Sequence, residues 1–127
     1  MSAAAFRRRW PAWGLALLLL ATVGCAQRKV EAVRNWKPAV AAEPLAAQAG
    51  RLLEAPRWGS FRDDSGFFVT VSGTLRAEPG IPVEIVYGAD TLPPAVAWFS
   101  LAGKRRPAGE YPGFLRRQLL LRALERR

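Results

Sequence analysis

Two stretches of the chain alternate between apolar and other side chains with a period of two residues, the pattern of half-buried β-strands. In residues 67–75 one face carries Phe67, Val69, Val71 and Leu75. Residues 81–87 repeat the pattern, and residues 58–61 form a shorter strand candidate. Turn signals, Asp63-Asp64-Ser65-Gly66 and Glu78-Pro79-Gly80, separate the three runs. The pattern therefore predicts an antiparallel meander.

The C-terminal part of the chain adds a strand and a helix to this prediction. The short apolar run 95–101 fits a fourth, buried strand, and residues 103–113 fit a basic loop rich in Pro and Gly. Residues 114–127 carry a leucine stripe with arginines over much of the rest, which predicts a helix. The predicted fold is α+β: a small antiparallel meander of three to four strands, covered by one C-terminal helix and preceded by a flexible tether.

The predicted tether comprises residues 26–56, where Ala and polar residues dominate and prolines interrupt at 38, 44 and 56. A short helix within residues 45–55 is weakened by Gly50. A coil of this length has a reach of roughly 30 Å. Trp36 is interpreted as an incidental aromatic or one at a lipid interface, with a docking anchor as the alternative.

The first 25 residues have the layout of an export signal. Arg7, Arg8 and Arg9 precede an apolar run, residues 14–24, that ends at Cys25, the only cysteine. A helix that crosses a bilayer needs about 20 apolar residues, so this run is short for a membrane span.

The segment Thr22-Val23-Gly24-Cys25 resembles the lipobox of bacterial lipoproteins, with Thr22 in place of the common leucine. The resemblance implies cleavage after Gly24, a diacylglycerol on the Cys25 sulfur and an acylated amine. Ala26, rather than aspartate, implies the outer membrane, facing the periplasm, over the inner membrane. The expected organisation is a signal peptide at 1–24, a lipidated N-terminus and linker at 25–56, and a small domain at 57–127.

The composition of the chain argues against several kinds of metal site and catalytic site. The chain has no histidine, and its one cysteine is assigned to the lipid. Zinc sites, disulfides and nucleophiles activated by histidine are therefore not expected. Asp63 and Asp64 are interpreted as a solvated turn, since a calcium loop needs further acidic ligands. We expect no enzyme, no metal and no cofactor beyond the lipid; convergence of Asp63, Asp64, Glu84 or Asp90 in a cleft would argue otherwise.

A net charge of +9 predicts attraction to anionic surfaces. The candidate contacts for a protein partner, anionic lipid or cell wall are the basic side chains Lys104, Arg105, Arg106, Arg116 and Arg117; the alternative is a solvated loop. The C-terminal helix has three interpretations: it packs on the sheet, lies on the membrane, or docks into a partner. Nucleic acid is not expected as a ligand of an exported lipoprotein.

The main hypothesis is a membrane-anchored, non-catalytic accessory or assembly component of an envelope complex for secretion, conjugation, pilus formation or outer-membrane assembly. This rests on analogy with small basic lipoproteins. The alternative is a periplasmic lipoprotein that binds a small ligand or the cell wall, in a cleft between the sheet and the loop at Pro93-Pro94.

Overall fold

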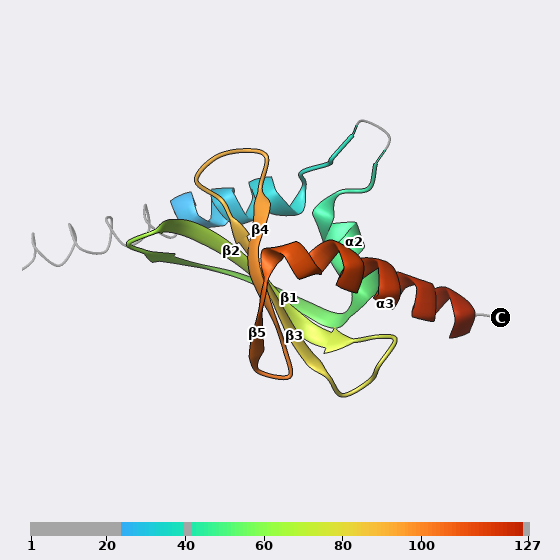
Figure 1. Cartoon of the computed structure of the whole chain (residues 1–127). Helices are drawn as coiled ribbons and strands as arrows, with labels where there is room; N and C mark the ends of the chain where they lie inside the picture. The colour runs from blue at the N-terminus through green and yellow to red at the C-terminus, as the bar shows by residue number, and fades with distance from the viewer. Residues whose placement is uncertain (1–23, 40–41, 126–127) are drawn as a thin grey trace, which may run out of the picture.

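A computed structural model describes residues 24–39 and 42–125. Residues 24–34 are helical, and the elements that follow are α2 (Leu45–Leu52), β1 (Leu53–Asp63), β2 (Gly66–Leu75), β3 (Pro82–Gly88), β4 (Ala95–Leu101), β5 (Lys104–Pro107), a 3-10 turn (Ala108–Glu110) and α3 (Tyr111–Glu125). The strands form one antiparallel sheet in chain order (Figure 1). This confirms the predicted α+β meander, with five strands instead of three to four.

The fifth strand replaces part of the predicted basic loop. Lys104 pairs with Leu101, and the hairpin closes through Ala102 and Gly103, which have φ values of 52° and 82°. A two-residue turn with both residues at positive φ suits the twist of a hairpin. The basic side chains of β5 are also ordinary for an edge strand, where charge discourages further strand pairing.

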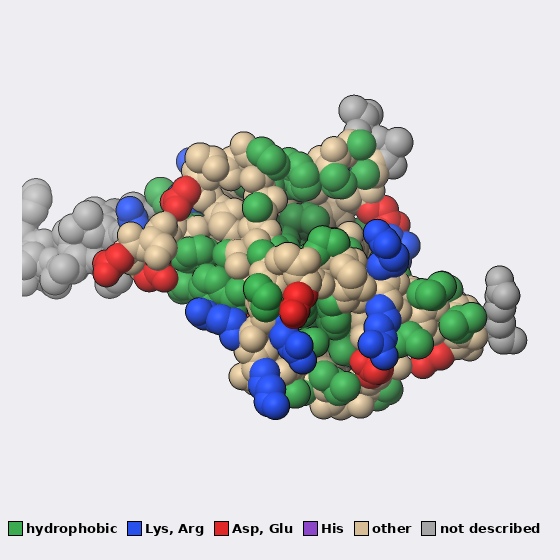
Figure 2. Space-filling model, in the orientation of Figure 1, with side chains coloured by type: hydrophobic (Ala, Val, Ile, Leu, Met, Phe, Trp, Pro, Cys, Tyr) green, Lys and Arg blue, Asp and Glu red, His purple; other side chains and the backbone are tan. Residues whose placement is uncertain are grey.

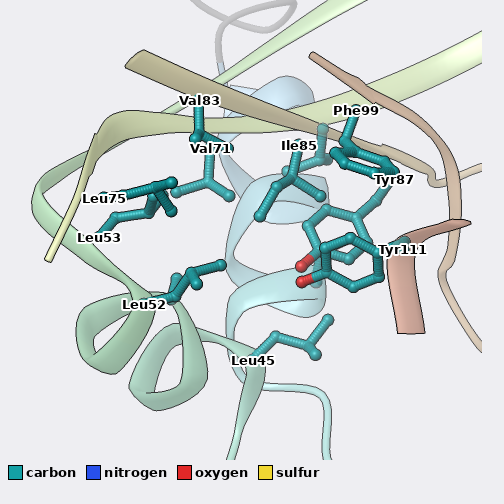
Figure 3. Packing of buried hydrophobic residues seen from close by; sticks show 13 residues of the cluster. Leu45, Leu52, Leu53, Val71, Leu75, Val83, Ile85, Tyr87, Phe99 and Tyr111 are labelled. Carbon is teal, nitrogen blue, oxygen red and sulfur yellow. The ribbon is translucent and has the colours of Figure 1, made fainter. Parts of the chain in front are cut away.

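One sheet face carries the core, as the alternation predicts. Val69, Val71 and Leu75 of β2 lie beside Val83 and Ile85 of β3, all of them buried (Figure 3). Phe99 of β4 is also buried on this face, where its ring lies 5.5 Å from that of Tyr111 and 5.0 Å from that of Phe114. These contacts attach the start of α3 to the sheet.

The segment before the sheet differs from the predicted flexible tether. Its described residues form two helices, and both contribute to the core through Val33, Leu45, Ala49 and Leu52. Leu45, Ala49 and Leu52 are spaced four and three residues apart, so they share one helix face. Gly50 has open space around its Cβ position. Trp36 packs against the core, which corrects its interpretation as an incidental aromatic.

Coverage of the core face is therefore shared by three helical segments (Figures 1 and 3). Tyr111 is buried and Phe114 and Leu115 pack against the core, but Leu120 and Leu124 are 61% and 56% exposed. The N-terminal half of α3 thus covers the sheet, as predicted, and its C-terminal half extends beyond it. No helix among the described residues is both long enough and apolar enough to cross a membrane.

The opposite sheet face carries a smaller aromatic cluster. The Phe68 ring lies 5.0 Å from that of Phe61 and 5.4 Å from that of Trp98, beside the fully buried Val86. The Arg105 guanidinium stacks on Trp98 at 4.0 Å, a cation–π contact that shields this ring. Phe99 is buried in the main core, Trp58 packs at the margin of that core, and Trp98 belongs to this second cluster.

Candidate functional site

A groove of about 730 Å³ separates the β4–β5 hairpin from the first three turns of α3. Its apolar lining comes mainly from Leu75, Ile81, Phe99, Leu101 and Phe114. Its charged and amide lining comes from Glu78, Lys104, Arg106, Glu110, Arg117 and Gln118. Figure 2 shows Lys and Arg side chains on the hairpin and beside α3, with hydrophobic side chains between them. We refer to this feature as the β5–α3 groove.

The basic residues reach this groove because of strand geometry. Successive side chains of a strand point to opposite faces, so Lys104 and Arg106 lie on the core side of β5 and Arg105 on the other. Arg117 approaches from α3, whereas Arg116 is exposed outside the groove. The structure thus brings together Lys104, Arg106 and Arg117 of the five predicted contact residues.

Two carboxylates, Glu78 and Glu110, also line the groove, and Glu110 compensates part of this charge. Arg106 lies 3.7 Å from Glu110 in a half-exposed ion pair, which is worth little in water. Lys104 and Arg117 have no carboxylate partner among the described residues. The groove therefore presents unpaired positive charge above an apolar floor, which suits an anionic side chain carried on a partly apolar surface.

Gln118 lies beneath this charge and is only 4% exposed. Its amide nitrogen donates to Glu78 at 3.1 Å, while its side-chain oxygen is buried without a hydrogen-bond partner in the described structure. A buried acceptor without a donor costs about 1–3 kcal/mol. Gln118 is not among the residues predicted for this site, although its spacing of three from Leu115 places it on the buried helix face.

The acidic residues serve structural roles or lie apart. Asp63 accepts a hydrogen bond from the Ser65 amide at 2.7 Å, as in an ordinary Asx turn. Asp90 accepts from the Phe67 amide at 3.1 Å, in space that a Cβ on Gly66 would occupy. Glu84 lies on the opposite sheet face, between Ser72 and Ser100. Among the described residues, no three acidic or cysteine side chains are grouped so that they can hold a metal.

Cys25 is exposed and lies at the start of the described part of the first helix. Val33, eight residues later, is 1% exposed and belongs to the core. A helix rises about 1.5 Å per residue, so Cys25 lies roughly 12 Å along the helix from this core residue. Gly24 is exposed beside it, while the basic leader and most of the apolar run lie outside the described residues.

The two tyrosines of the chain form a buried pair. Tyr87 of β3 and Tyr111 of α3 direct their hydroxyl groups toward one another inside the core (Figure 3). Burial raises the pKa of Tyr87, and the neighbouring Tyr111 raises it further. Burial also raises the pKa of Tyr111, and the neighbouring Tyr87 hydroxyl offsets part of this rise. The pair stabilises the junction of sheet and α3 as a neutral unit.

This pair predicts a specific loss of stability in alkali. An unfolded tyrosine ionises near pH 10, whereas each folded tyrosine ionises only at higher pH. The stabilisation is therefore complete below about pH 10 and falls above it, by at most about 1.4 kcal/mol per pH unit for each tyrosine. Denaturant unfolding across this range measures the slope, and a Tyr87→Phe, Tyr111→Phe double variant is expected to show a smaller one. An equal slope in both proteins would contradict the assignment.

Comparison with family models, with curated proteins and with solved structures finds no match to this chain.

Proposed function

We propose that this protein is a lipid-anchored, non-catalytic component of the bacterial envelope that binds an acidic segment of a partner protein in the β5–α3 groove. The observation that supports this most strongly is the convergence of Lys104, Arg106 and Arg117 from two elements above an apolar floor. Opposite charges that meet at the rim of an interface contribute mainly to specificity and to the rate of association. The apolar floor of the groove contributes affinity.

The lipobox supplies the anchor in this proposal, with the lipid on Cys25 and the outer membrane, facing the periplasm, as its location. The helical start of the domain would then hold the body near the head groups rather than on a long tether. The start of the first helix and the far end of α3 lie at opposite ends of the molecule (Figure 1). That arrangement supports partner binding by α3 over contact of its far end with the anchoring membrane.

Charge reversal provides the test with matched controls. Tagged protein carrying Lys104→Glu and Arg117→Glu is compared, in its own host, with protein carrying Arg105→Glu and Arg116→Glu. The expected result is loss of a co-purifying acidic protein by at least tenfold in the groove variant, and its retention in the control. Equal recovery from both variants, or recovery of free monomer alone from the unmodified protein, would refute the proposal.

The alternative, binding of a cell-wall ligand, was predicted at the loop of Pro93-Pro94, which lines neither groove. A cell-wall ligand could use the charges of the β5–α3 groove instead, since peptidoglycan peptides carry carboxylates. Soluble peptidoglycan fragments added to the purified protein distinguish the two. We expect no saturable binding of these fragments that depends on Lys104 and Arg117. Saturable binding lost in the groove variant would establish the alternative instead.

A further inference from the structure

A second groove, of about 520 Å³, lies on the other side of α3, between that helix and the end of α2. Six residues line it: Gly50, Arg51, Arg76, Leu119, Arg122 and Ala123. Half of these residues are arginines and none is acidic. We refer to this feature as the α2–α3 groove; it shares no lining residue with the β5–α3 groove.

Arg76 is held in place by the backbone. Its Nε donates to the carbonyl oxygens of Gly50 at 2.8 Å and Leu53 at 3.1 Å, at the C-terminal end of α2. These bonds fix the plane of the guanidinium group, and they use only its Nε–H donor. The two terminal amino groups remain for another acceptor, and no carboxylate pairs with Arg76 among the described residues. A donor fixed in advance loses little entropy when a ligand binds.

Arg51 and Arg122 supply the other two positive charges of the groove. Arg51 forms an ion pair with Glu43, but both side chains are about half exposed, so the pair is weak. Arg122 is half-buried on the facing side of α3 and has no carboxylate partner in the described part of the chain. Three guanidinium groups around one small groove repel one another unless an anion lies between them.

We propose that the α2–α3 groove binds a phosphate ester. A phosphate monoester carries up to two negative charges and three terminal oxygens, so it can accept from guanidinium groups on more than one side. A carboxylate has two oxygens in one plane and a single charge. It would therefore leave most of the positive charge of the three arginines uncompensated. The inference is independent of the proposed partner binding, because it concerns different residues on the other side of α3.

Phosphate esters are available in the envelope as soluble metabolites and as lipid head groups. The first test uses the full chain in detergent, titrated with inorganic phosphate and with glycerol phosphate against chloride at equal ionic strength. We expect saturable binding, weakened at least tenfold by Arg122→Gln and unchanged by Arg116→Gln. Arg122 is chosen because Arg76 also supports the fold. Equal affinity in both variants, or no saturable effect beyond that of chloride, would overturn the proposal.

A vesicle experiment then separates the two sources. Protein reconstituted in phosphatidylcholine vesicles is mixed with vesicles that contain phosphatidate, and clustering is measured. Clustering that requires Arg122 supports the proposal with a lipid head group as the ligand. Saturable binding of soluble phosphate without clustering supports it with a soluble ester.

Discussion

Replacing Val33 with aspartate is expected to lower the free energy of unfolding by about 3–5 kcal/mol, because it places a carboxylate without a partner in the core. Val33 is 1% exposed in the first helix and packs with residues of the sheet and of α2. The loss is large relative to the stability of a small domain, so partial unfolding at growth temperature is expected. Denaturant unfolding followed by tryptophan fluorescence measures it.

Ala32 provides the matched control, since it is exposed in the same helix one residue earlier. Ala32→Asp is expected to change the free energy of unfolding by less than about 0.5 kcal/mol. If Val33→Asp were as mild as this control, the first helix would not be part of the folded domain. The prediction therefore distinguishes the structured start seen here from a flexible tether.

If the proposed lipoprotein assignment is correct, replacing Cys25 with alanine is expected to abolish lipid attachment completely. Only the thiolate sulfur of Cys25 can accept the diacylglycerol, since the chain has no other cysteine. Without that modification the lipoprotein leader is not expected to be cleaved. The variant should therefore incorporate no labelled palmitate, retain the mass of its leader and disappear from the outer-membrane fraction.

Ala26→Ser is the control for this experiment, because it alters the neighbouring residue and leaves the thiol in place. It should keep the label and the mass of the unmodified mature protein. Palmitate label on the Cys25→Ala variant, or a mature mass equal to that of the control, would refute the lipoprotein assignment while leaving the groove proposals to their own tests.

The strands could be predicted from the sequence because their signal is local. Alternation in residues 67–75 and 81–87 identified the faces that carry Val69, Val71 and Ile85, and the structure confirms them. Residues 95–101 form the predicted fourth strand, but Phe99 is the one residue in it that is buried, so the strand is not buried throughout as predicted. Residues 104–107 were predicted as loop because arginine, lysine and proline have no apolar alternation, although the Ala102-Gly103 turn was a usable hairpin signal.

The two helices before the sheet were harder to predict because their stability depends on distant residues. The segment 45–52 is short and contains Gly50, so local propensity argues against it. It is held by burial of Leu45, Ala49 and Leu52 against a sheet that follows in sequence. Tertiary packing of this kind outweighs local helix propensity. The local sequence of a helix shows its apolar face but does not show the sheet face against which it packs.

The candidate site could be predicted only in part, because it too depends on residues that are distant in sequence. The charge run at 104–106 was visible, but its division between two sheet faces follows only once β5 is recognised as a strand. The arginines of the α2–α3 groove are far apart in sequence, at positions 51, 76 and 122, and no local pattern links them. Their proximity is a consequence of the way α2 and α3 meet beside the end of β2.

The most direct test of the proposed function compares two adjacent residues of β5 in living cells. A photoreactive amino acid is placed at position 104, which faces the β5–α3 groove, or at position 105, which faces the opposite side of the sheet. We predict a discrete cross-linked product with an acidic envelope protein from position 104 and none from position 105. Equal products from both positions, or no product from position 104, would contradict partner binding in the groove.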